Sequence, residues 1–136
     1  MTIRLGKSSL SFTMYDAANT ERPIIFEPYI VRGGISMTAN LREAFKSVEL
    51  LTPDIRRCQL LVDTPSILVP IEQFEEDDME TILNHALPMK SAKRIVHYNV
   101  LPNLKTVCLF GIVKEVQGAI DDRFDDFQFI HAMVPV

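Results

Sequence analysis

The stretch that decides the fold is IRLGKSSL, residues 3–10. Ile3 and Leu5 alternate with polar residues before Gly6, and the alternation resumes at Leu10. A period of two between apolar residues is typical of a β-strand with one buried face. Glycine can take the positive φ of a tight turn. The stretch therefore predicts a β-hairpin whose turn begins at Gly6.

The composition bounds the class of protein. The chain has 136 residues, of which 47% are hydrophobic and 24% are charged, and its net charge is -4. A chain of this length forms one domain with a sizeable core, and these proportions exclude a disordered protein. A nucleic-acid surface needs clustered Lys and Arg. Because the basic residues are scattered along the chain, we expect no nucleic-acid partner.

Apolar runs and cysteines indicate the environment of the protein. No apolar run reaches the roughly 20 residues that cross a bilayer, and residues 1–7 lack the apolar core of a signal peptide. We therefore predict no transmembrane segment and a cytoplasmic location. Cys58 and Cys108 lie in apolar surroundings without a CxxC spacing. We interpret both as buried free thiols.

The rest of the chain alternates between strand and helix signals. Periodicity and the positions of Gly and Pro predict, in chain order, a strand at 24–31, a helix at 40–51, strands at 59–63 and 66–71, a helix at 77–87, strands at 94–101 and 104–113, a helix at 113–124 and a strand at 127–136. Asn40 and Glu43 resemble a capping box at the start of the first helix. Residues 59–63 are expected to be buried on both faces. This order predicts an α/β fold, a mixed sheet with covering helices.

Several of these segments resemble the actin-like ATPase superfamily, which has an RNase H-like fold. Its first phosphate loop reads as an apolar residue, Asp, an apolar residue, Gly and small hydroxyl residues, which residues 3–10 resemble. The chain is also similar to the actin-like scaffold proteins of type IV pilus assembly and type II secretion. The matching segments are Leu87-Pro88, 97–100, 107–113 and 114–116. The N-terminal half of a bacterial family of uncharacterised proteins with this fold is similar as well.

The resemblance implies that the whole chain, 1–136, is a single actin-like lobe and the N-terminal half of a two-lobe protein. Its degenerate phosphate loop would consist of Arg4, Gly6, Lys7, Ser8 and Ser9.

The loop departs from the family at the acidic position. In the family the acid serves the Mg²⁺ region of the nucleotide, and Mg²⁺ needs oxygen ligands. Arg4 stands at that position and cannot coordinate Mg²⁺. We therefore expect that the protein is not an enzyme, and we assign no catalytic residue, no metal site and no cofactor.

Three functions remain open. The first is a non-catalytic scaffold lobe that binds protein partners, since the resemblance implies capture of peptide segments of neighbouring proteins at the cytoplasmic face of a membrane. The second is a nucleotide-binding actin-like ATPase, completed by a second lobe and using ATP with Mg²⁺. The third is an anion-binding regulatory domain, in which backbone N–H groups of residues 6–9 hold phosphate with help from Arg4 or Lys7.

The remaining acidic residues and histidines fit simpler interpretations. Acids at 72–80 crowd a helix N-terminus, where the macrodipole favours them, so we expect a solvated face. The acids at 121–126 lack the Gly and Glu of a calcium loop, and we expect another exposed surface. His85, His97 and His131 have no metal-ligand spacing and lie in separate elements.

Asp63 is the one acid placed at the end of a central strand. Open α/β sheets bind ligands at that end of their strands. The alternative, which we favour, is that Asp63 and Thr64 cap the next turn.

The chain ends in an apolar, strand-like run at 127–136. A natural chain seldom stops inside a buried strand. We therefore expect a second lobe, or a partner in a homo-oligomer, to cover Val134–Val136.

Overall fold

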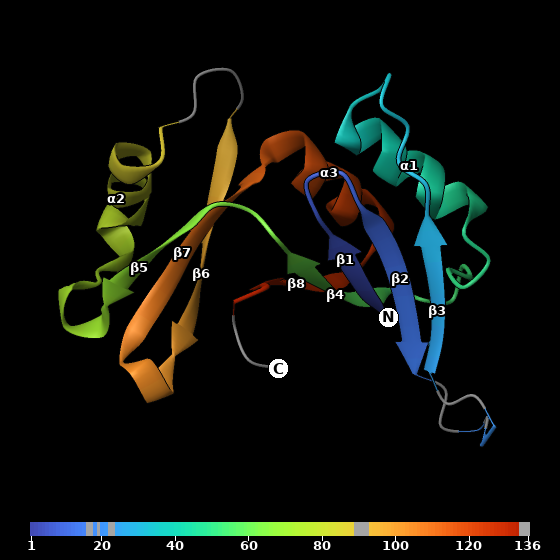
Figure 1. The fold of residues 1–136 in the computed structure, drawn as a ribbon, viewed down its shortest axis with the longest axis horizontal. Helices are drawn as coiled ribbons and strands as arrows, with labels where there is room; N and C mark the ends of the chain where they lie inside the picture. The colour runs from blue at the N-terminus through green and yellow to red at the C-terminus, as the bar shows by residue number, and fades with distance from the viewer. Residues whose placement is uncertain (16–17, 19, 22–23, 89–92, 134–136) are drawn as a thin grey trace.

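The computed structural model describes residues 1–15, 18, 20–21, 24–88 and 93–133. Figure 1 shows two sheets side by side, with helices packed on them. The five strands of sheet A are, in spatial order, β3 (Ile24–Tyr29), β2 (Leu10–Tyr15), β1 (Thr2–Leu5), β4 (Arg57–Val62) and β8 (Asp126–His131). The three strands of sheet B are β5 (Ser66–Pro70), β7 (Thr106–Val113) and β6 (Arg94–Leu101).

The helices are α1 (Met37–Ser47), α2 (Met79–Ala86) and α3 (Lys114–Arg123), with short 3₁₀ turns η1 (Ile71–Gln73), η2 (Glu76–Asp78) and η3 (Pro102–Leu104). Strand β1 pairs antiparallel with β2 and parallel with β4, and β4 pairs parallel with β8. The α/β fold with a mixed sheet is therefore confirmed. The expectation of a single sheet is wrong, because the segment between β4 and α3 folds into the antiparallel sheet B with α2.

The main core lies on one face of sheet A. Ile3, Leu5 and Phe12 are buried there together with side chains of α1 and α3. Residues of the opposite face, such as Arg4 and Gln59, are exposed. Strand β4 is therefore buried on one face only, and the expectation of two buried faces is wrong for it.

Strand β7 is the strand that is buried on both faces. Cys108 and Phe110 belong to the main core, whereas Val107 and Leu109 belong to a second core under α2. Because β7 lies at the centre of sheet B and both of its faces are covered, its sequence is a nearly continuous apolar run.

The turn of the first hairpin forms without a left-handed glycine. No glycine has a positive φ, and the one described residue that does is Lys105, at 48°. The expectation for Gly6 is therefore wrong. The Gly6 N–H donates to the Ser9 carbonyl at 2.9 Å, and a Cβ at Gly6 would lie 2.3 Å from Ser9 Oγ. Gly6 is thus suited to this turn by its lack of a side chain.

Helix α1 begins before the residue that the sequence indicated. Ser36 is the N-cap, and its Oγ accepts the Ala39 N–H at 3.1 Å. Asn40 lies one turn into the helix and is fully buried. Its side chain accepts the Arg32 N–H at 2.8 Å and donates to the carbonyls of Arg32 and Ser36. The predicted capping box at Asn40 is wrong, since the Asn40 side chain instead binds the backbone of the loop that precedes the helix.

The C-terminal strand is covered in part by the chain itself. Phe129 is buried, and Phe127 packs against the main core. The ring of Phe129 lies 4.7 Å from that of His97, centroid to centroid. The expected cover over Val134–Val136 lies outside the described residues.

Candidate functional site

A pocket of about 560 Å³ lies where the two sheets meet. Its walls come from the carboxyl ends of β1 and β4, the first residue of α1, the end of α2 and the facing ends of β6 and β7. We call it the inter-sheet pocket; its lining residues are Leu5, Gly6, Lys7, Met37, Asp63, Thr64, Pro65, Ala86, Leu87, Pro88, Arg94, Gly111, Ile112, Val113 and Val116. Ligands of open α/β sheets bind at this end of the strands.

The pocket is mainly apolar. Leu5, Ile112 and Val116 form part of the wall and also belong to the main core. Met37 and Val113 are half-buried against that core. The walls are therefore formed in part by core residues of strands and helices, and their apolar character suits an apolar group.

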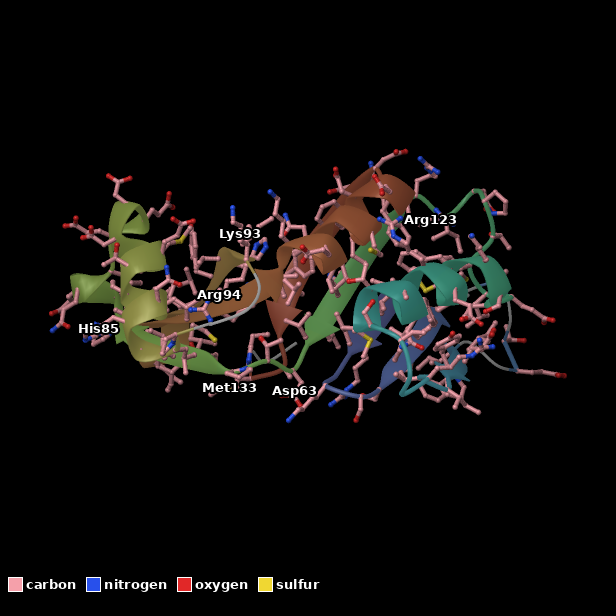
Figure 2. All side chains as sticks on the ribbon, turned by 90° about the horizontal axis from the view of Figure 1, so that it is seen from above. Asp63, His85, Lys93, Arg94, Arg123 and Met133 are labelled. Atoms are coloured by element: carbon pink, nitrogen blue, oxygen red, sulfur yellow. The ribbon has the colours of Figure 1, made fainter. Side chains whose placement is uncertain are left out.

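Arg94 is a half-buried cation in the pocket wall. Figure 2 shows it beside α2, and its Nη2 donates to the Leu83 carbonyl at 3.2 Å, to Asn84 Oδ1 at 3.0 Å and to the Leu87 carbonyl. A cation at a helix C-terminus is stabilised by the macrodipole. The Arg94 side chain crosses Gly111, where an added Cβ would lie 2.4 Å from Arg94 Cδ.

Two polar atoms in the pocket lining are buried without a hydrogen-bond partner. They are Thr64 Oγ1 and Arg94 Nε. Lys7 and Asp63 lie at the rim and are exposed, and neither forms an ion pair within the described ranges. In this part of the chain the Asp63 carboxylate also caps no turn, so the favoured interpretation of Asp63 as a cap is wrong.

The predicted phosphate-loop residues divide between different surfaces. Gly6 and Lys7 line the inter-sheet pocket, whereas Ser8 and Ser9 are exposed at the turn and do not line it. Arg4 is exposed on the face of sheet A opposite the main core. The sequence therefore identified one edge of the pocket. It missed Arg94, although a glycine within the apolar strand β7 signals the close approach of another group.

Two histidines lie against Phe110 at the junction of the sheets, which their separate positions in the sequence did not predict. The rings of His97 and His131 lie 5.8 Å and 5.4 Å from that of Phe110. His131 Nε2 lies 2.6 Å from the Thr64 carbonyl, and the Met133 N–H donates to its Nδ1 at 3.1 Å. Because Nδ1 accepts a hydrogen bond, the ring proton is on Nε2, which donates to the Thr64 carbonyl. His131 thereby positions the peptide segment at Thr64 that lines the pocket. His85 is exposed on α2.

Asn99 joins β6 to the edge of β8. Its Nδ2 donates to the Phe129 carbonyl at 3.2 Å, and its Oδ1 accepts the His131 N–H at 2.8 Å. The side-chain amide thus takes the place of a neighbouring peptide group, so part of the β8 edge is satisfied by sheet B.

The acidic surfaces lie where the sequence indicated. The acids of residues 72–80 are exposed, and Glu76 accepts a hydrogen bond from Tyr98. Asp125 and Asp122 are also exposed and pair with Arg56 and Arg42, with N–O distances of 2.9 Å and 3.1 Å. These pairs tie α3 and the start of β8 to other elements.

The two cysteines are free and buried, as predicted. Burial raises the pKa of the Cys58 thiol to about 12 and also raises the pKa of the Cys108 thiol. Neither residue lines the inter-sheet pocket.

Comparison with known proteins identifies the family. The model of the family DUF3822, described as a protein of unknown function, matches residues 1–136. The chain belongs to this family. A search of curated proteins gave no match for this DUF3822 chain. None of its described helices is both long and apolar enough to span a membrane.

A solved structure has the same fold. It is a protein from Bacteroides thetaiotaomicron, described as having an actin-like ATPase fold and unknown function. The two chains are 25% identical, with a TM-score of 0.80. The match covers 96% of this DUF3822 chain and 50% of the other, so the chain spans half the length of that protein. The predicted actin-like fold is confirmed.

Proposed function

We propose that this chain is a non-catalytic actin-like lobe that binds a segment of another protein in the inter-sheet pocket. The observation that carries the proposal is the chemistry of that pocket, whose walls are mainly apolar and to which the predicted phosphate loop contributes Gly6 and a cation, Lys7, but no acid. Apolar concave sites with few polar groups are typical binding sites. The free thiols fit the cytoplasm, where we place the protein.

A second lobe completes the proposed protein. The chain spans half of its structural neighbour, and that ratio supports a two-lobe arrangement with this chain as the N-terminal lobe. A homo-oligomer is the alternative way to cover the C-terminal strand.

Selection from a random peptide library tests the binding function. Ala86 is a small, exposed residue in the pocket wall, so Ala86→Trp fills the pocket without entering the core. Thr81→Trp places the same ring at an exposed position of α2 that does not line the pocket. We expect apolar peptides that bind the unmodified chain and Thr81→Trp but not Ala86→Trp. Failure to enrich any peptide, or equal binding to both variants, would overturn the proposal.

One observation favours nucleotide binding as a second candidate. Among the described residues the Asp63 carboxylate has no ion-pair partner. It lies at the pocket rim with Gly6, because the Asp63 N–H donates to the Leu5 carbonyl at 3.1 Å. The acid that directly follows β4 would thus serve Mg²⁺ and ATP in place of the acid that Arg4 replaces.

A further inference from the structure

We propose that the ligand of the inter-sheet pocket is an apolar chain that carries one carboxylate. The inference rests on the proposed function, since it takes the same pocket and adds the chemistry of the bound segment. Such a segment has apolar residues next to an Asp, a Glu or a C-terminal carboxylate.

The size and walls of the pocket indicate the apolar part of the proposed ligand. A volume of about 560 Å³ is that of a site for a small organic molecule or a few side chains. Leu5, Met37 and Ile112 approach it from sheet A, α1 and sheet B, and Leu87 closes it from the end of α2. An apolar group there is shielded from water on several sides, which favours its transfer from solvent.

The charged residues at the pocket indicate the polar group of the proposed ligand. Two cations, Lys7 and Arg94, and one acid, Asp63, are present in the lining. Lys7 has no ionic partner within the described ranges. Arg94 uses its Nη2 for the end of α2, while its Nε has no acceptor. A carboxylate supplies acceptors that form charge-assisted bonds with such groups.

One of the two unpartnered atoms favours a ligand acceptor over a ligand donor. Arg94 Nε can only donate, whereas Thr64 Oγ1 can donate or accept and does not discriminate. A buried donor without an acceptor is unfavourable, and an ammonium ligand would bring further donors. Asp63 opposes an anion, so its charge is expected to weaken binding of the carboxylate.

Calorimetric titration with octanoate, octanamide and octylammonium tests the inference on the full chain. These probes share one apolar chain and differ in the end group. We expect octanoate to bind about tenfold or more tightly than the other two. Acetyl-Leu-Leu with a free carboxylate and its amide form a second arm, which distinguishes a peptide from a simple alkyl chain.

Two variants and one control test whether the ligand carboxylate binds at the pocket. Lys7→Glu should weaken octanoate binding about tenfold, and Asp63→Asn should strengthen it. Lys105→Glu makes the same charge change at the far end of sheet B, outside the pocket lining, and should leave binding unchanged.

The titrations can overturn the proposal of a carboxylate ligand in three ways. Equal binding of octanoate and octanamide, or equal effects of Lys7→Glu and Lys105→Glu, would overturn it but leave an apolar binding pocket. Absence of binding by every probe would also overturn it. The proposed function fails separately, when peptides selected from the library ignore Ala86→Trp.

Discussion

The Arg94 side chain of β6 lies over Gly111 of β7, whose partner in the strand register is Val96. The Arg94 guanidinium is held by acceptors of α2, so its Cδ cannot move away freely from a new Cβ. Gly111→Ala should therefore lower the free energy of unfolding by about 1–3 kcal/mol, as overpacked sites do. Gly118→Ala is the control, because its added Cβ would meet no described atom within 4 Å beyond its chain neighbours and the backbone of its own helix. In α3 it should raise stability by about 0.5–1 kcal/mol. Denaturant titration measures both, and equal stability of the two variants would contradict the described packing.

Asn99 of sheet B links the two sheets through two hydrogen bonds to the backbone of β8. Asn99→Ala leaves the Phe129 carbonyl and the His131 N–H without their partner. An unsatisfied buried group costs about 1–3 kcal/mol, so the variant should unfold at lower denaturant. Asn103→Ala in the exposed turn η3 should stay within about 0.5 kcal/mol of the unmodified chain. A loss at Asn103 as large as that at Asn99 would refute the role of Asn99.

The start of α1 can be tested as an element. Ser36→Ala removes the N-cap acceptor and should cost about 1 kcal/mol. Asn40→Ala removes three hydrogen bonds at a fully buried position and should cost more. Thermal unfolding of both variants measures the order. The reverse order would contradict the buried hydrogen-bonding role of Asn40, whereas an unchanged stability of Ser36→Ala would contradict Ser36 as the N-cap.

The junction of β8 with β4 contains a pH-dependent ion pair. Hydrogen bonds from Arg56 hold the pKa of Asp125 below its usual value. The pair therefore stabilises the fold above the ordinary pKa of an aspartate, and this contribution is lost as the pH falls through the lowered pKa. Arg56→Gln should lower the melting temperature slightly at about pH 7 and not in strong acid, because the pair is exposed.

A neighbouring arginine gives the control for this pair. Arg57 lies 3.9 Å from Asp126, a longer contact between more exposed side chains. Arg57→Gln should leave the melting temperature unchanged at both pH values. A loss of stability for Arg56→Gln that persists unchanged in acid would show that the ion pair is not its cause.

The sequence predicted elements better than it predicted their assembly. The strand at 94–101 and the alternation around Gly6 followed from local periodicity, and both are present in the structure. The second sheet did not follow, because a period of two reports a strand but not its partner. In the candidate site, Gly6 and Lys7 could be indicated by the loop. Arg94 could not, because it reaches the pocket through contacts between β6, β7 and α2 that are distant in sequence.

In the whole molecule, the two sheets together form the inter-sheet pocket. The match to the actin-like neighbour covers 96% of this chain, so both sheets belong to the shared fold. Sheet B with α2 closes one side of the largely apolar pocket at the carboxyl edge of sheet A. We infer that binding at this site, and not nucleotide turnover, is the role of the lobe.

Thermal unfolding with ATP and Mg²⁺ tests that central claim most directly. Phosphate and Mg²⁺ alone serve as controls. A ligand at 100 times its dissociation constant adds about 2.7 kcal/mol, which moves the midpoint by several degrees. We expect the same midpoint with ATP and Mg²⁺ as with Mg²⁺ alone. A shift of several degrees that needs both ATP and Mg²⁺, and that Asp63→Asn abolishes, would contradict it.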